Sequence, residues 1–221
     1  LKFGKTTFST PNYAPEQKFD WLDMVTKLFI GSYDTVRPAG LPFVYCGVLT
    51  LLLVPAYFFS RKYPVRQRIV SSVFILIFLV SFLLTVPDLL WHGFQKPNWL
   101  NYRYSFMLVF VLLVLAYKGM REIREQSPKS LFAVGGVLAC LIMVLQKFEY
   151  ESFVLDGKYG FEEGRIDPLR TVWLSIAMIV FLCAVVSLFM KARSAVTRRN
   201  MSLVLLMVIC FEAFANGVIL M

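Results

Sequence analysis

The sequence has few of the residues from which metal and nucleophilic sites are built. It contains one histidine, His92, and four cysteines, all of which fall inside apolar runs without CxxC spacing. A single histidine excludes a multi-histidine zinc site within these 221 residues, and buried cysteine behaves as a small hydrophobe. The P-loop, GxGxxG, GxSxG and HExxH motifs are also absent. We therefore expect no metal and no cofactor here.

Long apolar runs dominate the chain instead. Hydrophobic residues make up 58% of it, and its mean hydropathy is +0.65. A helix of about 20 mostly apolar residues crosses a bilayer, whereas the alternating pattern of membrane β-barrel strands is missing. The sequence predicts an all-α polytopic membrane bundle of about six transmembrane helices. The six runs are 41–60, 69–91, 98–118, 131–148, 171–190 and 201–221.

Basic residues are concentrated in three short connections between these runs. Connections 61–68, 118–130 and 191–199 hold 12 of the 23 lysines and arginines. The positive-inside rule places such loops in the cytoplasm, in a multi-pass protein of the cell membrane. The net charge of +9 follows from this topology and requires no nucleic acid. The segments expected outside are 1–40, 92–97 and 149–170.

The chain opens on Leu1, without an initiator methionine or a signal peptide. Because it begins in a segment expected outside, an earlier span is needed to carry that segment across. We therefore interpret the sequence as a piece of a larger protein. It divides into an extracytoplasmic segment, residues 1–40, and a transmembrane helical domain, residues 41–221.

Two features of the outer segments carry predictions. In the first segment, one helix face is apolar and the opposite face holds Asp20, Asp23 and Lys27, which predicts a short amphipathic helix on the outer leaflet or against missing extracellular structure. The segment 149–170 is rich in carboxylates, which suit a general base, a divalent cation or simply a solvated loop. The apolar face comprises Trp21, Leu22, Val25, Leu28 and Phe29.

A cation is expected inside the third apolar run. The helix must begin near Asn98 to cross the bilayer, which places Arg103 below its outer end. Charge at such a depth is costly and needs an anionic partner. One interpretation is an ion pair with Asp88 of the preceding run. The other is that Arg103 binds the phosphate of a membrane lipid, because a guanidinium matches phosphate oxygens bidentately.

Neighbouring side chains extend both interpretations. Trp99 and Arg103 share a helix face, as do Asn98 and Tyr102. These pairs present aromatic and amide groups to a sugar, or they form an aromatic belt at the membrane surface. A second intramembrane charge, Glu212, lies in the last run. It predicts either a proton or ion pathway or a protonated carboxyl hydrogen-bonded to Asn216 or to a neighbouring helix.

Two sequence blocks resemble the YfhO-like family of bacterial membrane proteins. One block consists of Trp91–Phe94, Pro97–Trp99 and Tyr102–Phe106. The other, upstream, consists of Gly31–Asp34, Leu41–Pro42 and Tyr45–Gly47. Together they span roughly residues 27–118, whereas residues 131–221 match only as hydrophobic helices.

The resemblance implies a large multispanning enzyme similar to GT-C glycosyltransferases. Such an enzyme works outside the cytoplasm of Gram-positive bacteria, with a polyprenyl-phosphate-linked sugar as donor and lipoteichoic acid or a related cell-envelope polymer as acceptor. The family's presumed base, an acidic residue of the first extracytoplasmic loop, is not identified in this sequence, so no catalytic residue is carried over.

Sugar transfer needs groups that stabilise the leaving phosphate. The residues expected to contact phosphate are Arg103, His92 and Lys96, and those expected to contact sugar or prenyl chain are Trp99, Asn98 and Tyr102. Two alternatives stay open: a transporter or flippase for a lipid-linked or anionic substrate, with Glu212 as its coupling carboxylate, and a non-catalytic membrane scaffold.

Overall fold

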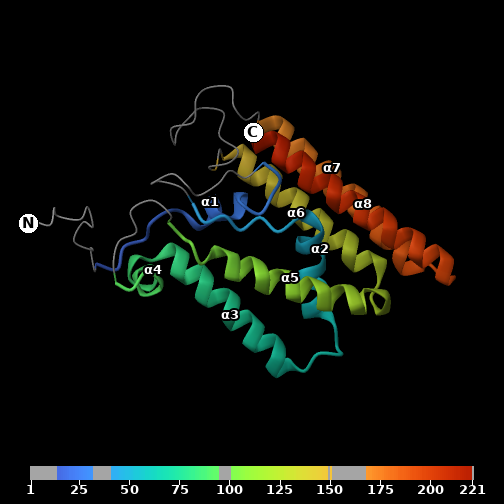
Figure 1. The fold of residues 1–221 in the computed structure, drawn as a ribbon, viewed down its shortest axis with the longest axis horizontal. Coiled ribbons are helices and arrows are strands. Elements are labelled where there is room, and N and C mark those ends of the chain that lie inside the picture. The colour runs from blue at the N-terminus through green and yellow to red at the C-terminus, as the bar shows by residue number, and fades with distance from the viewer. Residues whose placement is uncertain (1–13, 32–40, 95–100, 149, 151–167, 221) are drawn as a thin grey trace, which may run out of the picture.

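A computed structural model describes residues 14–31, 41–94, 101–148, 150 and 168–220. All regular structure in these ranges is helical, which confirms the predicted all-α class (Figure 1). The elements are α1 (Trp21–Thr26), α2 (Val48–Phe59), α3 (Val65–Leu83), α4 (Thr85–Trp91), α5 (Ser105–Glu122), the 3-10 turn η1 (Ile123–Glu125), α6 (Pro128–Lys147), α7 (Pro168–Lys191) and α8 (Ala195–Leu220).

Four of these helices are long and apolar enough to cross a membrane: Val65–Leu83, Pro128–Lys147, Thr171–Lys191 and Ala195–Val218. The chain is therefore a helical membrane bundle. The first and third predicted runs yield shorter helices than expected. α2 has 12 residues and α5 has 18, because residues 41–47 are not helical and α5 begins only at Ser105.

The helices run alternately up and down, with α2 at the centre of the bundle. α2 packs on α5, α6 and α7, whereas α3 packs chiefly on α4 and α5 (Figure 1). α7 and α8 form a hairpin along one edge. Glycine permits the tightest contact, because a Cβ on Gly119 of α5 would overlap the carbonyl oxygen of Leu53 in α2.

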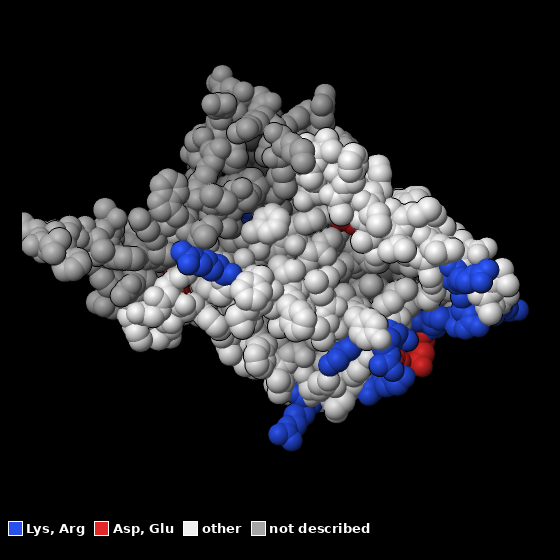
Figure 2. Space-filling model, in the orientation of Figure 1, with Lys and Arg blue, Asp and Glu red and all other residues white. Residues whose placement is uncertain are grey.

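Lysines and arginines gather at one end of the bundle, which we call the basic end (Figure 2). It comprises the α2–α3, α5–α6 and α7–α8 connections. Polar side chains there bond to carbonyl oxygens at or just after the ends of helices, which have no partner within the helix. Arg68 donates to the Phe58 oxygen in the last turn of α2 at 2.9 Å, and Arg124 donates to the oxygen of Ala192, directly after α7, at 3.1 Å. These cations thus also stabilise the helix ends.

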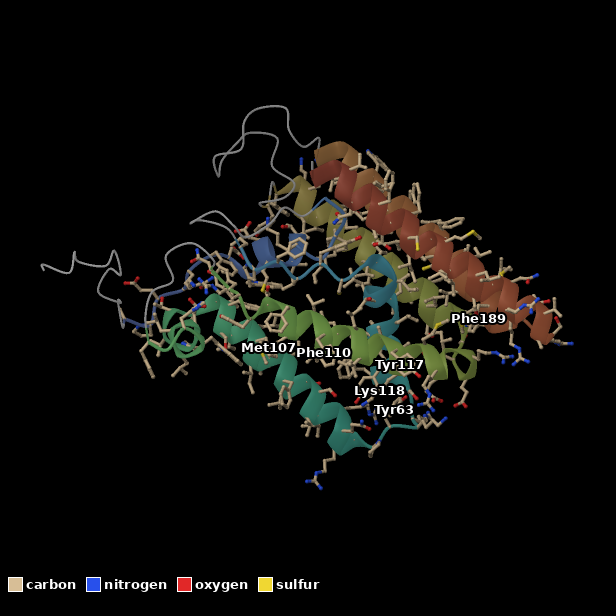
Figure 3. The ribbon with its side chains drawn as sticks, viewed as in Figure 1. Tyr63, Met107, Phe110, Tyr117, Lys118 and Phe189 are labelled. Carbon is tan, nitrogen blue, oxygen red and sulfur yellow. The ribbon has the colours of Figure 1, made fainter. Side chains whose placement is uncertain are left out.

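Between the two ends, the outward faces of the helices are apolar. Met107, Phe110 and Tyr117 lie along one face of α5 (Figure 3), and the exposed fractions of Phe110 and Tyr117 are 67% and 66%. α3 and α8 expose similar rows of large hydrophobic side chains. Such extensive apolar surface is unusual for a soluble monomer and fits contact with lipid.

α1 differs from the amphipathic helix predicted for this segment. It has only six residues, and its buried side chains include Asp23, which was expected on the polar face. Lys27, also expected there, is fully buried, whereas Trp21 is 55% exposed. The segment enters the bundle directly after α1, where the Gly31 N–H donates to Asn216 Oδ1 of α8 at 2.7 Å. Tertiary packing therefore overrides the helical pattern.

Candidate functional site

The predicted span 69–91 is broken near its end opposite the basic end. Leu84 has extended backbone angles, φ −107° and ψ 141°, and separates α3 from α4. Pro87 explains the break. In a continuous helix its ring would clash with the carbonyl of Leu83, and Pro87 has no backbone N–H to donate to that carbonyl. In α4, Pro87 lies in the first turn, where no internal donor is needed.

The chain segment before α1 forms hydrogen bonds with the backbone groups that this break leaves without a partner in the helix. Lys18 N–H donates to the Leu83 carbonyl at 2.8 Å, and Thr85 N–H donates to the Glu16 carbonyl at 3.1 Å. Gln17 and Leu84 thereby form an isolated antiparallel bridge. The docked segment brings the side chain of Lys18 over α4.

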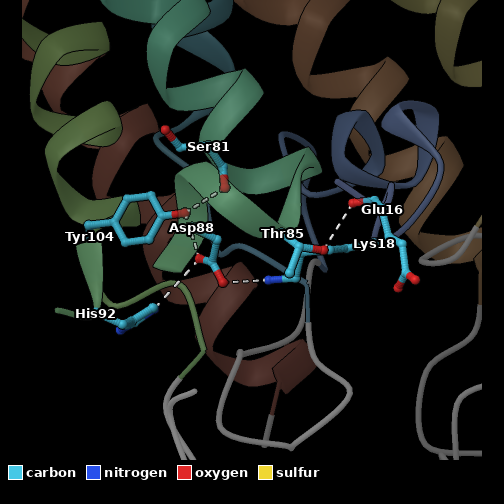
Figure 4. Close-up of polar contacts among 7 residues, drawn as sticks. All are labelled: Glu16, Lys18, Ser81, Thr85, Asp88, His92 and Tyr104. Atoms are coloured by element: carbon cyan, nitrogen blue, oxygen red, sulfur yellow. Dashed lines mark hydrogen bonds and ion pairs between the residues drawn. The ribbon is translucent and has the colours of Figure 1, made fainter. Parts of the chain in front are cut away.

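Asp88 of α4 is the centre of a polar group that we call the Asp88 cluster: Lys18, Asp88, His92 and Tyr104 (Figure 4). Lys18 Nζ donates to Asp88 Oδ2 at 2.7 Å, and the Tyr104 hydroxyl lies 2.8 Å from Asp88 Oδ1. The same hydroxyl lies 2.9 Å from the Ser81 carbonyl oxygen. The Asp88 side chain is only 6% exposed, and this ion pair compensates for burying its charge.

His92 completes the cluster from the end of α4. Its Nε2 lies 3.6 Å from Asp88 Oδ1, and its side chain is 9% exposed. Among the described residues, Nε2 has no hydrogen-bond partner. Burial lowers the pKa of His92, as do the charges of Lys18 and Arg103, whereas Asp88 raises it. The net direction is downward, so the imidazole is neutral at pH 7.

Stacked aromatic rings form the floor of the cluster. The ring of Tyr104 lies between Trp91 and Phe82, with centroid distances of 4.9 and 5.0 Å. Tyr102 is buried, and Lys18 Nζ lies 4.1 Å from its ring centroid. Tyr102 thus contributes a cation–π contact to Lys18, and its buried position does not present it directly to a sugar.

Arg103 lies in the turn before α5, outside any helix. The predicted helix from Asn98 is thus wrong in its first turns, at least over residues 101–104, which are described as turn. The positive φ of Tyr102, 56°, marks this turn. Arg103 is exposed, and the partners shown for Asp88 are Lys18, Tyr104 and His92 instead of Arg103. Its charge nevertheless reaches the cluster, because it lowers the pKa of His92.

An apolar groove of about 570 Å³ lies in the bend between α3 and α4. Ser81 and Trp91 border both the groove and the aromatic floor of the Asp88 cluster. Most of the α3 side chains that line the groove belong to the exposed apolar surface, whereas Ser81 is buried. A cluster of polar and charged side chains and an apolar groove therefore adjoin at this end of the bundle. The lining residues are Val73, Leu76, Ile77, Val80, Ser81, Pro87, Leu90 and Trp91.

Comparison with known families identifies the group to which the sequence belongs. Residues 1–221 match the family described as "Bacterial membrane protein YfhO". The chain belongs to the YfhO family. No curated protein and no solved structure matches it significantly.

Glu212, the other intramembrane charge of this YfhO-family chain, is separate from the Asp88 cluster. Its carboxylate is buried on α8, and Oε1 accepts hydrogen bonds from the Tyr45 hydroxyl and the Val48 N–H, both at 2.6 Å. It thus caps the first turn of α2. Of the two predicted partners of Glu212, the structure shows the neighbouring helix, α2. Asn216, the other predicted partner, accepts a hydrogen bond from Gly31 instead.

Several predicted residues of this YfhO-family chain lie outside the described ranges. They are Lys96, Asn98 and Trp99, together with the carboxylates of 149–167. Conversely, sequence reasoning missed Lys18 and Tyr104. Lys18 is 70 residues from its partner Asp88, and no local pattern signals such a pairing. Pro87 inside an apolar run was the available signal that a backbone carbonyl would need an outside donor.

Proposed function

We propose that this YfhO-family chain is part of an extracytoplasmic membrane glycosyltransferase. It transfers a sugar from a polyprenyl-phosphate donor to a cell-envelope polymer such as lipoteichoic acid. The observation that carries the proposal is the position of the Asp88 cluster beside the α3–α4 groove. A polyprenyl phosphate joins the same two features, a negative headgroup and an apolar chain.

The chemistry of the transfer fits the residues at this end of the bundle. Breaking the bond between sugar and phosphate leaves charge on the phosphate, which positive groups stabilise. Arg103 is exposed and carries a planar guanidinium suited to phosphate oxygens. The prenyl chain lies in the apolar groove, against side chains of α3 that belong to the lipid-facing apolar surface. Family membership supports the membrane setting.

The test is sugar transfer by the full-length protein in detergent, with purified polyprenyl-phosphate sugar and acceptor. We expect turnover by wild type and at least a tenfold loss in Arg103→Ala, because a charged hydrogen bond contributes about 1.5–3 kcal/mol and about 1.4 kcal/mol corresponds to tenfold in rate. Lys129→Ala, which removes an exposed cation at the basic end, is the matched control and should keep wild-type turnover. Undiminished activity of Arg103→Ala would exclude this role for the guanidinium.

One observation favours a second candidate, a transporter or flippase. The first predicted span is helical only over α2, and the N-terminus of α2 meets the buried Glu212 carboxylate inside the bundle. In many transporters, helix ends that lie within the membrane meet charged groups at the substrate site. In the same assay, transport would instead require sealed vesicles and a proton gradient, and it would fail in Glu212→Gln. Transfer in detergent without a gradient would contradict it.

A further inference from the structure

Asp88 faces two basic groups, but only one of them, Lys18, forms a close ion pair with it. Lys18 Nζ is 2.7 Å from Oδ2, and its side chain is 25% exposed. His92 Nε2 is 3.6 Å from Oδ1, is buried, and has no hydrogen-bond partner among the described residues. The carboxylate therefore has one charged partner in contact with solvent, Lys18. A second basic group, His92, lies nearby without a hydrogen bond to it.

We propose that Lys18 binds the phosphate of the lipid-linked donor, and that His92 takes a proton from solvent and replaces Lys18 as the counter-ion of Asp88. The nature of the anion rests on the proposed function. In this exchange Lys18 keeps its charge and changes its partner. His92 gains one proton, and no covalent bond forms or breaks.

The anchoring of Lys18 permits such an exchange. Its backbone is fixed by the hydrogen bond from its N–H to the Leu83 carbonyl, and its ammonium is carried on a four-carbon stem with freely rotating bonds. The side chain is therefore able to turn toward an incoming anion while the docked segment stays in place. Asp88, by contrast, is buried, and an unpaired buried carboxylate strongly destabilises a protein. A replacement counter-ion is needed.

The charges around His92 give the exchange its direction. The groups that face it are Asp88 from α4, Lys18 from the docked segment, and Arg103 and the Tyr104 ring from the turn before α5. Burial lowers the pKa of His92 most, Lys18 and Arg103 lower it further, and Asp88 raises it. A phosphate that neutralises Lys18 and Arg103 removes the lowering influence of these two charges, while that of burial remains. The pKa of His92 then rises, and the imidazole becomes protonated against Asp88.

The experiment measures proton uptake when the protein binds a short-chain polyprenyl phosphate. Calorimetric titrations of the full-length protein in detergent, in two buffers of different ionisation enthalpy, give the number of protons taken up. We expect wild type to take up a measurable fraction of one proton at pH 7 and to bind more tightly toward acid pH, by at most tenfold per pH unit. His92→Gln should bind without this uptake.

Variants of Lys18 test the other half of the exchange. Lys18→Gln should lower affinity at least tenfold, Lys18→Arg should keep most of it, and Lys129→Gln at the basic end should not change it. Lys18→Arg and His92→Gln keep the test decisive even if Lys18→Gln does not fold. Binding without proton uptake in wild type, or wild-type affinity in a folded Lys18→Gln, would overturn the inference.

Phosphatidic acid and the uncharged polyprenol separate this inference from the proposed function. Proton-linked binding of phosphatidic acid, with no preference for polyprenyl phosphate, would support the exchange at Lys18 and count against the donor. Sugar transfer accompanied by proton-free binding would leave the function standing and overturn the exchange. Equal binding of polyprenol would overturn the exchange as well, because the phosphate would then contribute nothing.

Discussion

Asp88 and His92 lie four residues apart at the end of one helix. The Asp88 carboxylate is held by Lys18 and Tyr104, and His92 is neutral beside it. Its buried ring is stabilised in that neutral form, because burial disfavours a charged imidazole. The cluster is therefore sensitive to acid at His92.

Lowering the pH below about 6.5, the usual pKa of histidine, should destabilise the protein through His92. The folded-state pKa is lowered, so the unfolded chain binds this proton first and acid shifts the equilibrium toward unfolding. The slope contributed by one group is at most about 1.4 kcal/mol per pH unit. Thermal unfolding in detergent between pH 7 and pH 5 measures it. His92→Gln should show a smaller acid loss than wild type, and an equal loss would contradict the prediction.

At the scale of the elements, hydropathy predicted where helices lie but not where they break. The runs 131–148 and 171–190 became α6 and α7 within a few residues, because burial of apolar side chains in lipid determines the positions of spans. Hydropathy does not register backbone hydrogen bonds. It therefore missed the non-helical residues 41–47 and the break at Leu84, which are stabilised by distant donors and acceptors.

The candidate site was likewise predictable only in part, because hydropathy locates charges within apolar runs but not contacts between distant segments. Arg103 and Asp88 could be singled out as charges inside apolar runs, and the structure brings Asp88 together with His92, another predicted site residue. Lys18 was not predictable, because its place depends on the bridge between Gln17 and Leu84. Its pairing depends on tertiary structure, which a scan of single segments does not contain.

The contact between α2 and α5 depends on the absence of a side chain at Gly119. Gly119→Ala should lower the free energy of unfolding by about 1–3 kcal/mol or more, because the new methyl group overlaps the Leu53 backbone oxygen and the helices must separate. Gly136→Ala is the matched control, since a Cβ there meets no atom within 4 Å. It should be neutral or slightly stabilising, given the higher helix propensity of alanine. Unfolding in detergent compares the two, and equal effects would contradict close packing.

For the molecule as a whole, the two ends differ in charge. The basic end combines surplus cations with bonds to helix termini, such as Arg68 to Phe58. The opposite end carries the Asp88 cluster and the groove. If the basic end faces the cytoplasm, as the positive-inside rule predicts, the Asp88 cluster meets only substrates of the outer leaflet. The proposed donor must then have been flipped outward before it binds.

This orientation is testable with single cysteines at the two ends. Glu16→Cys lies next to the docked Lys18, and Lys129→Cys lies at the start of α6; both positions are exposed. In intact cells, a membrane-impermeant maleimide should label Glu16→Cys, whereas it should label Lys129→Cys only after the membrane is permeabilised. The unmodified protein corrects for its four native cysteines, of which Cys183 is buried. The reverse labelling pattern would place the Asp88 cluster in the cytoplasm, where a flipped donor is not accessible, and would contradict the extracytoplasmic reaction.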